Sequence, residues 1–461
     1  MKHMWHVLGA LLLLASLAQA QIKLDAAHAR EAFQNFEKAG FSARPPANAP
    51  GGKQWQLVIV LNTSDNTIWN MVDDTRKELY RQIQMGNLKR AVLVYSREDG
   101  TTYMNIFPKN QLGGVASRIL YQSDPKRQAR VQQQSRQFKH EFNDTDTPQY
   151  DYAQWDASAL STQAAVDLIF SSLESSPNLH TGIIFNAHGS GHHMRNYIKT
   201  ADKKPFQIAH LVHAIQANRL SVDVLDLSSC MMGTIANTYQ LLSQTNIKYL
   251  ITASNLGMSE FASTLNGVIS SKGTFRLVHL LDRTPQEAAL NSIQEKVSTR
   301  ASYTHNSMVI NGTIFRKYTA PALLTWMREV SSSQYLISAP SKNQGYDRPS
   351  FLAILNQVIT NTAGNQRLQQ ASTQLKQASL QSYVAYKCAD AHTHKLYSSI
   401  AAIPANSDCI AGVSVDDKAL KELSALTNIS LPDANSVRKQ QAKAFLSKTL
   451  KQGKGQRKIT Y

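Results

Sequence analysis

Short apolar runs alternate with amphipathic stretches along the central part of the chain. Five runs rich in Val, Ile and Leu close on Gly, Ser or Asn, which predicts buried strands; they are 55–61, 91–95, 183–185, 222–227 and 249–254. Between and after them, helical spacing of apolar residues predicts helices at 67–84, 162–173, 208–217, 233–245 and 273–297. Strands that alternate with helices form a parallel sheet. The pattern therefore predicts an α/β fold, a mainly parallel sheet with helices on both faces.

Beyond residue 315 helical spacing dominates. It predicts helices at 323–330, 351–361, 366–378 and 436–451, with short strands at 383–386 and 410–415. Residues 100–156 are polar and irregular, which indicates insertions. We divide the chain into a signal peptide (1–20), a leader and linker (21–53), an α/β domain (54–315), a mostly helical C-terminal region (316–433) and a basic tail (434–461).

The first twenty residues have the pattern of a secretory signal. Lys2 precedes an apolar run at 7–17, and Ala18-Gln19-Ala20 forms an A-x-A cleavage site. The alternative, a membrane anchor, is disfavoured because the run is too short to span a bilayer easily. We therefore expect an exported protein, secreted or periplasmic, without a transmembrane segment. Residues 21–53 are then a propeptide or a plain extension.

The formal net charge of +17 is concentrated toward the C-terminal end. The tail after Asp433 holds eight Lys and Arg residues and no acidic one. Such a tail can contact an anionic surface, a lipid or a cell-envelope polymer, the alternative being a solvated tail. No zinc finger or aromatic stacking motif accompanies it, so we expect no specific nucleic-acid partner.

A histidine and a cysteine each follow one of the predicted strands. His188-Gly189 comes after the run 183–185, and Cys230 comes after the run 222–227. Sites in parallel sheets form at the carboxyl ends of strands, so the two side chains can meet as a nucleophile and its base. Taken singly, such a cysteine is commonly a small buried hydrophobe, and such a histidine a hydrogen-bonded loop residue. Gly189 and the small residues around Cys230 favour the reactive interpretation.

Four motifs in order resemble the clostripain family of cysteine peptidases, which is grouped with caspases, legumains and gingipains. They are L-V-I-V-L-N-T-S-D-N-T-I-W-N-M-V-D-D (57–74), A-H-G-S-G-H (187–192), L-S-S-C-M-M-G-T (227–234) and Y-L-I-T-A-S (249–254). In the family the second and third motifs usually read D-H-G-S-G-W and F-D-A-C-L-M-A-T. The resemblance covers residues 55–310 and implies a caspase/hemoglobinase-like fold.

The resemblance also implies an activity, that of a secreted cysteine endopeptidase acting on a protein or peptide substrate. Cys230 would form a thioester acyl-enzyme, with His188 as the other member of the dyad and the N–H groups of Gly189 and Cys230 as the oxyanion hole. No cofactor is required. Calcium dependence is implied by the resemblance alone, because the sequence has no acidic calcium loop. The alternative is a catalytically inactive clostripain-like protein that binds protein or cell-envelope polymers.

Specificity is where the chain departs from the family. Family members prefer Arg or Lys before the cut, and the aspartate of F-D-A-C lies in that pocket. Ser228 replaces this aspartate, and Asp226, two residues earlier, is either a pocket acid or a structural strand acid. His192 replaces the family tryptophan. The residues expected to line the pocket are Ser228, Ser229, Asp226, Ser254 and Asn255, and we expect the basic preference to be altered.

Three smaller patterns complete the analysis. Cys388 and Cys409 can form a disulfide in an oxidising compartment, leaving Cys230 as the odd thiol; the alternative is two unpaired cysteines. Some relatives cleave themselves between the catalytic strands, and the basic residues of that loop here, either a processing site or an ordinary surface, are Arg195, Lys199, Lys203 and Lys204. The histidines near His188 lack the acid or thiol pattern of a zinc signature, so we expect no metal site.

Overall fold

The computed structural model describes residues 53–62, 69–96, 102–108, 126, 153–156, 158, 160–186, 189–192, 200–227, 229–255, 284–296, 304–337, 349–404 and 407–432. Several sequence predictions lie outside these residues. They are the signal peptide, the leader and linker up to residue 52, the first part of the helix expected at 273–297, and the basic tail with its helix at 436–451.

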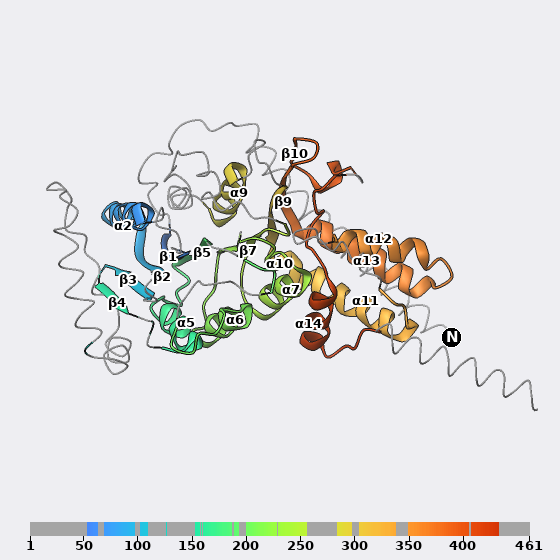
Figure 1. The fold of residues 1–461 in the computed structure, drawn as a ribbon, viewed down its shortest axis with the longest axis horizontal. Helices are drawn as coiled ribbons and strands as arrows, with labels where there is room; N and C mark the ends of the chain where they lie inside the picture. Colours follow the sequence, from blue (N-terminus) through green and yellow to red (C-terminus); the bar gives the residue numbers. More distant parts are fainter. Residues whose placement is uncertain are drawn as a thin grey trace, which may run out of the picture.

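One mixed sheet organises the described residues (Figure 1). Its strand order is β10-β9-β8-β7-β6-β5-β1-β2-β3-β4. The strands are β1 (Gln54–Asn62), β2 (Leu88–Ser96), β3 (Thr102–Phe107), β4 (Ala153–Asp156), β5 (Leu179–Asn186), β6 (Val224–Leu227), β7 (Tyr249–Thr252), β8 (His305–Asn311), β9 (Tyr383–Asp390) and β10 (Lys395–Tyr397). The central strands β7, β6, β5, β1 and β2 are parallel, and antiparallel strands extend both edges. The predicted α/β class is confirmed.

Helices cover both faces of the sheet. One face carries α5 (Thr162–Ser171), α6 (Ile208–Ala217) and α7 (Ile235–Gln244), and the other carries α2 (Trp69–Gln84) and α9 (Pro285–Lys296). Because side chains alternate along a strand, Val58 and Val60 of β1 pack toward the first layer, whereas Leu57 and Ile59 pack toward the second. Burial on both faces explains why the central strands are continuous apolar runs rather than alternating ones.

Four of the described strands, β3, β4, β8 and β10, lie where the sequence predicts none. In β3 the polar residues Thr102 and Asn105 are fully buried. The hydroxyls of Thr102 and Ser96 share a hydrogen bond of 2.9 Å, and Arg76 Nε donates to Asn105 Oδ1 at 2.8 Å. Partners supplied by neighbouring elements allow these polar groups to be buried. An apolar pattern alone therefore does not reveal the strand, and the expectation of irregular structure at 100–156 is wrong for β3 and β4.

The chain beyond residue 315 returns to the same sheet. The helical elements are α10 (Gly312–Ile314), the π-helical turn η4 (Phe315–Thr319), α11 (Ala320–Ser333), α12 (Phe351–Asn361), α13 (Gln366–Ser382), the 3₁₀ turn η5 (Ile400–Ala402) and α14 (Asp417–Thr427). In their core Trp326 packs edge-on against Phe351, and its Nε1 donates to Ser372 Oγ at 3.1 Å. β9 and β10 then extend the sheet beyond β8, and α14 packs against α7.

A disulfide fastens this C-terminal region to the edge of the sheet. Cys388 lies in β9, Cys409 follows η5, and their Cα atoms are 6.1 Å apart. The bond therefore anchors the segment that leads into α14. Cys230 is the cysteine outside it.

Candidate active site

Cys230 lies in the turn between β6 and α7, at the carboxyl end of a central parallel strand. Its side chain is half-buried. The backbone of the turn is tied to the end of β7: Met231 N–H donates to the Asn255 carbonyl at 2.7 Å, and Gly233 N–H donates to the Ala253 carbonyl at 2.7 Å. Met231 has a φ of +60°, a left-handed conformation that is uncommon for a side chain with a Cβ. The cysteine is thus held in a sharp, anchored turn.

Gly189, which follows His188 in sequence, lies directly against this turn. A Cβ placed on Gly189 would be 2.3 Å from the Cys230 carbonyl oxygen and 2.8 Å from Met232 Cγ. Only a residue without a Cβ permits so close an approach of two backbones. The structure therefore brings the loop that follows β5 into contact with the cysteine turn that follows β6.

Asn237 joins the same two loops from the first turn of α7. Its buried amide nitrogen donates to the Gly191 carbonyl at 2.9 Å and to the Met232 carbonyl at 3.0 Å. One side chain thereby fixes both loops at once. Sequence reasoning missed Asn237; a polar residue on the apolar face of a predicted helix is the signal that could have found it.

The segment Gly412–Ser414 supports the cysteine turn from the other side. Ser414 N–H donates to the Gly233 carbonyl at 2.8 Å, and the Ser414 carbonyl accepts from Ile235 N–H at 2.9 Å. A short strand was expected at 410–415; the structure has isolated bridges there, in which Ser414 pairs with Thr234 and with Ser350. The C-terminal region thus contributes backbone to the candidate site.

Two of the expected site residues, His188 and Ser228, lie outside the described residues. Their described neighbours, Gly189 and Ser229, are in place on the two loops. Arg195 and Lys199 of the basic loop also lie outside. Lys203 and Lys204 are exposed, and Lys203 has a φ of +50°, so this end of the loop is a surface turn.

Three of the expected pocket residues are buried among backbone groups. Ser254 is fully buried, and its hydroxyl donates to the Gly412 carbonyl at 2.6 Å and to the Gly233 carbonyl at 3.1 Å. The backbone N–H groups of Ser254 and Asn255 both donate to Asn306 Oδ1 at 2.9 Å. Ser229 and Asn255 are each 2% exposed. These residues shape the loops around Cys230, and Asn306 of β8 is a further shaping residue that sequence reasoning missed.

Asp226 occupies the interior of the sheet rather than its edge. It is 2% exposed, it lies in register with Ile184 and Ile251, and its Oδ2 accepts a hydrogen bond of 3.2 Å from Ser292 Oγ of α9. Neighbouring positions in register share a face, so Asp226 belongs to the α9 layer. This placement favours the second of the two interpretations, a structural strand acid.

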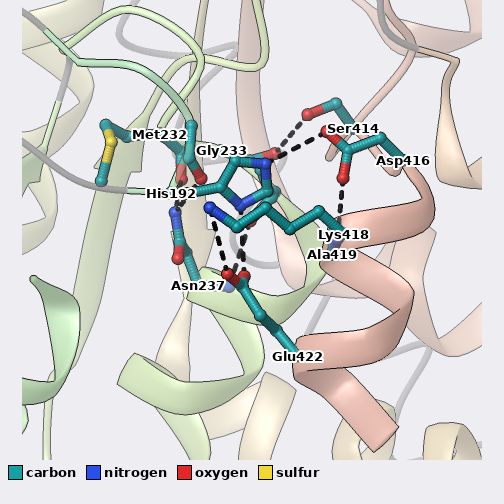
Figure 2. A network of polar contacts seen from close by, with 11 residues as sticks. His192, Met232, Gly233, Asn237, Ser414, Asp416, Lys418, Ala419 and Glu422 are labelled. Carbon is teal, nitrogen blue, oxygen red and sulfur yellow. Dashed lines mark hydrogen bonds and ion pairs between the residues drawn. The ribbon is translucent and has the colours of Figure 1, made fainter.

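His192, at the end of the motif A-H-G-S-G-H, is bound by α14 (Figure 2). Its Nδ1 is 3.2 Å from Glu422 Oε2, and its Nε2 is 3.2 Å from Asp416 Oδ2. Burial by itself would lower the pKa of His192, but the hydrogen bonds and charges of Asp416 and Glu422 outweigh it and raise the pKa above the ordinary value. Both carboxylates therefore favour the protonated ring.

The described part of the chain contains no cluster of three His, Cys, Asp or Glu side chains that could hold a metal ion. A histidine bound through both nitrogens to carboxylates has no lone pair left for a metal. Among the described helices, none combines the length and the apolar character that crossing a membrane requires.

No protein-family model matches the sequence, and no curated protein matches it. Solved structures do. The chain is similar to C11, clostripain-like, cysteine proteases. An inactive zymogen C11 protease from Parabacteroides distasonis has 10% sequence identity and a TM-score of 0.46, over 82% of this chain and 96% of that one.

Two further structures come from Bacteroides thetaiotaomicron. A secreted C11 cysteine protease, iotapain, has 12% identity and a TM-score of 0.45, over 84% of this chain and 100% of that one. A secreted C11 cysteine protease in complex with an irreversible peptide inhibitor has 16% identity and a TM-score of 0.42, over 74% of this chain and 85% of that one.

Proposed function

We propose that the protein is an exported cysteine endopeptidase in which Cys230 is the nucleophile and His188 is the acid and base. The observation that carries the proposal is the contact between Gly189 and the Cys230 carbonyl. His188 is bonded directly to Gly189, so we assign its imidazole to this contact, within reach of the Cys230 thiol. An imidazole within reach of a thiol is the arrangement that nucleophilic cysteine catalysis needs.

The reaction would proceed through two acyl transfers. The Cys230 thiolate attacks the carbonyl carbon of the peptide, the C–N bond breaks, and the His188 imidazolium donates its proton to the departing amine. A thioester remains. Neutral His188 then removes a proton from water, the hydroxide attacks the thioester carbonyl, and the C–S bond breaks to release the acid and restore the thiolate.

The backbone would stabilise the oxyanion in both steps. We assign this role to the N–H groups of Gly189 and Cys230, which belong to loops held together by Asn237 and by the Met231–Asn255 hydrogen bond. Preorganised donors are effective because they do not have to reorient as the charge develops. The anchored turn and the left-handed Met231 are consistent with such a rigid site.

The proposed enzyme does not select a basic residue before the cut. Asp226 packs under the sheet against α9, and the buried Ser254 hydroxyl is bound to backbone carbonyls. With serine at position 228, no described acidic side chain replaces the family aspartate at this loop. A guanidinium or ammonium in such a pocket would lack a counter-charge, so we expect a small or polar residue there.

Cleavage of a mixed peptide library tests the proposal. Wild-type protein, gently reduced, is compared with Cys230→Ala and with His188→Ala, and with His213→Gln as a control whose imidazole lies on α6 beside Asp167. We expect cleavage by wild type and the control, loss with either dyad variant, and labelling of Cys230 by an acyl-reactive electrophile. Cleavage that survives in Cys230→Ala contradicts the assignment. An inert thiol and no cleavage, with or without calcium or limited proteolysis, point to an inactive binding protein.

A further inference from the structure

His192 is held between two carboxylates of one helix. Asp416 is the N-cap residue of α14 and Glu422 lies further along the same helix, so the imidazole bridges two positions of α14 (Figure 2). The His192 side chain is 10% exposed, against 28% for Asp416 and 35% for Glu422. The histidine is therefore the buried member of the group and the carboxylates form its outer wall.

Both contacts require the protonated ring. A carboxylate accepts hydrogen bonds, and neutral imidazole has one N–H to donate, whereas the imidazolium has two. With acceptors 3.2 Å from each nitrogen, the cation makes both bonds and the neutral ring makes one. The raised pKa of His192 agrees with this geometry.

The contacts of His192 with α14 give a second connection between the two loops of the candidate site. His192 belongs to the same loop as Gly189, and the preceding residue, Gly191, is bound by Asn237 of α7. Asp416 follows Ser414, whose N–H binds the Gly233 carbonyl of the cysteine turn. The histidine loop and the cysteine turn are thus connected twice, once directly through Asn237 and once through the C-terminal segment and α14.

Among the described residues, the charged groups in contact with His192 belong to α14 and its N-cap. Asp416 and Glu422 contact the ring, and Lys418 lies 3.9 Å from the second oxygen of Glu422. The neighbouring helix α7 has no charged residue between Ile235 and Gln244; it faces α14 with neutral side chains, of which Tyr239 is the titratable one. Removing one carboxylate therefore removes one of the two groups that raise the pKa of His192.

We propose that His192 is a positioning residue, which as a cation between Asp416 and Glu422 holds the loop from Gly189 to His192, and with it His188, against the Cys230 turn. This inference rests on the proposed peptidase function. It assigns a role to the C-terminal region: α14 acts as an external support that keeps the two halves of the dyad together.

The pH dependence follows from the direction of the pKa shift. Because the folded-state pKa of His192 is raised above the unfolded value of about 6.5, the bridge contributes fully below that value and is lost as pH rises through the folded pKa. His192 should therefore stop holding the loop at pH values above its folded pKa. Glu422→Gln removes one of the groups that raise the pKa, so it should move the alkaline limb of kcat/KM to lower pH.

The experiment compares wild type with Glu422→Gln and His192→Gln, with His213→Gln as the matched control. His213 also contacts a carboxylate at 3.2 Å, that of Asp167, but it is exposed and lies on α6. We expect His192→Gln to lower kcat more than it changes KM, by roughly 10- to 100-fold, and to abolish the His192-dependent limb, because an amide does not titrate. Variants that keep the wild-type profile and kcat, with a lower Tm alone, would reduce His192 to a structural residue and overturn the proposal.

Two measurements without substrate separate this inference from the proposed function. Histidine labelled with ¹³C gives the His192 titration, assigned by its disappearance in His192→Gln; a pKa above 6.5 that falls in Glu422→Gln is expected. Hydrogen exchange at residues 189–192 should be faster in His192→Gln and unchanged in His213→Gln. If wild type cleaves nothing and yet shows both results, the loop support stands and the peptidase proposal fails. Unchanged exchange overturns the support whatever the activity.

Discussion

Gly189→Ala is the sharpest test of the contact between the two loops. The added methyl group would lie 2.3 Å from the Cys230 carbonyl oxygen, 2.8 Å from Met232 Cγ and 3.1 Å from Met232 Sδ. The methionine side chain can rotate away, but the carbonyl belongs to the backbone of a turn that is hydrogen-bonded to the end of β7. The clash must therefore be relieved by moving one loop relative to the other.

The size of the effect follows from that distance. A carbon–oxygen contact of about 3.3 Å is close to the ordinary limit, so the loops must separate by about 1 Å. A misplacement of 1 Å at a reacting site can lower the rate about 100-fold, which corresponds to about 2.7 kcal/mol in transition-state free energy. Overpacking of this kind also lowers the unfolding free energy by roughly 1–3 kcal/mol.

The assay measures kcat/KM on a fluorogenic peptide chosen from the library, beside the Tm and the rate of Cys230 alkylation. Gly312→Ala is the control for a backbone clash elsewhere, because its methyl group would lie 2.0 Å from the Ile247 carbonyl, at the opposite end of β7. Gly364→Ala is the control for a harmless methyl group, since nothing lies within 4 Å of it.

We expect Gly189→Ala and Gly312→Ala to lose stability alike, and Gly189→Ala alone to lose roughly 100-fold in kcat/KM at temperatures where all variants are folded. Gly364→Ala should match wild type in both respects. Full activity and wild-type Tm in Gly189→Ala would refute the reasoning, because the loops would then not be in contact as described.

Three further predictions concern the surroundings of the site. Asn237→Ala leaves the Gly191 and Met232 carbonyls without their side-chain donor. We expect urea unfolding to show an unfolding free energy lower by about 1–3 kcal/mol, together with a lower kcat/KM. An unchanged urea midpoint would exclude the bridge. Replacing Cys388 and Cys409 together by Ser opens a loop of 21 residues and should cost about 3 kcal/mol, measured by denaturant titration without reductant. Asp223→Asn should cost about 2 kcal/mol at neutral pH, because the buried carboxylate accepts from Lys248 and a backbone N–H. Burial alone would raise the pKa of Asp223, but His180 together with these donors lowers it, so the cost should shrink as pH falls below about 3.9 and through the folded pKa; a cost that persists in acid would contradict this.

Local patterns were sufficient for the central fold. The runs at 55–61, 91–95 and 222–227 are strands of the sheet because β-branched and aliphatic residues buried on both faces leave a continuous apolar signal. The helix at 351–361 was predicted with the bounds that the structure has. By contrast, β3 was missed because its buried polar residues find partners on neighbouring elements, as Asn105 does with Arg76.

Some features of the candidate site could likewise be predicted from the sequence, and others could not. That a histidine loop and a cysteine turn follow neighbouring strands could be derived from the sequence, because parallel strands bring their carboxyl ends to one edge. The placement of the pocket residues could not. Asp226 and Ser254 are polar residues in strand-end motifs. The sequence does not show that Asp226 is hydrogen-bonded to Ser292, or that the Ser254 hydroxyl is hydrogen-bonded to the Gly412 carbonyl.

The sequence by itself determined the order of the elements, the parallel centre of the sheet and the two loops that carry the proposed dyad, because each depends on periodicity within a few residues. The tertiary structure decided what holds those loops. Asp416 and Glu422 reach His192 across 224 and 230 residues of chain, and Ser414 reaches Gly233 across 181. No local pattern encodes such pairs, since they depend on the pairing of β9 with β8 in the sheet and on the Cys388–Cys409 bond, which anchors the segment leading to α14.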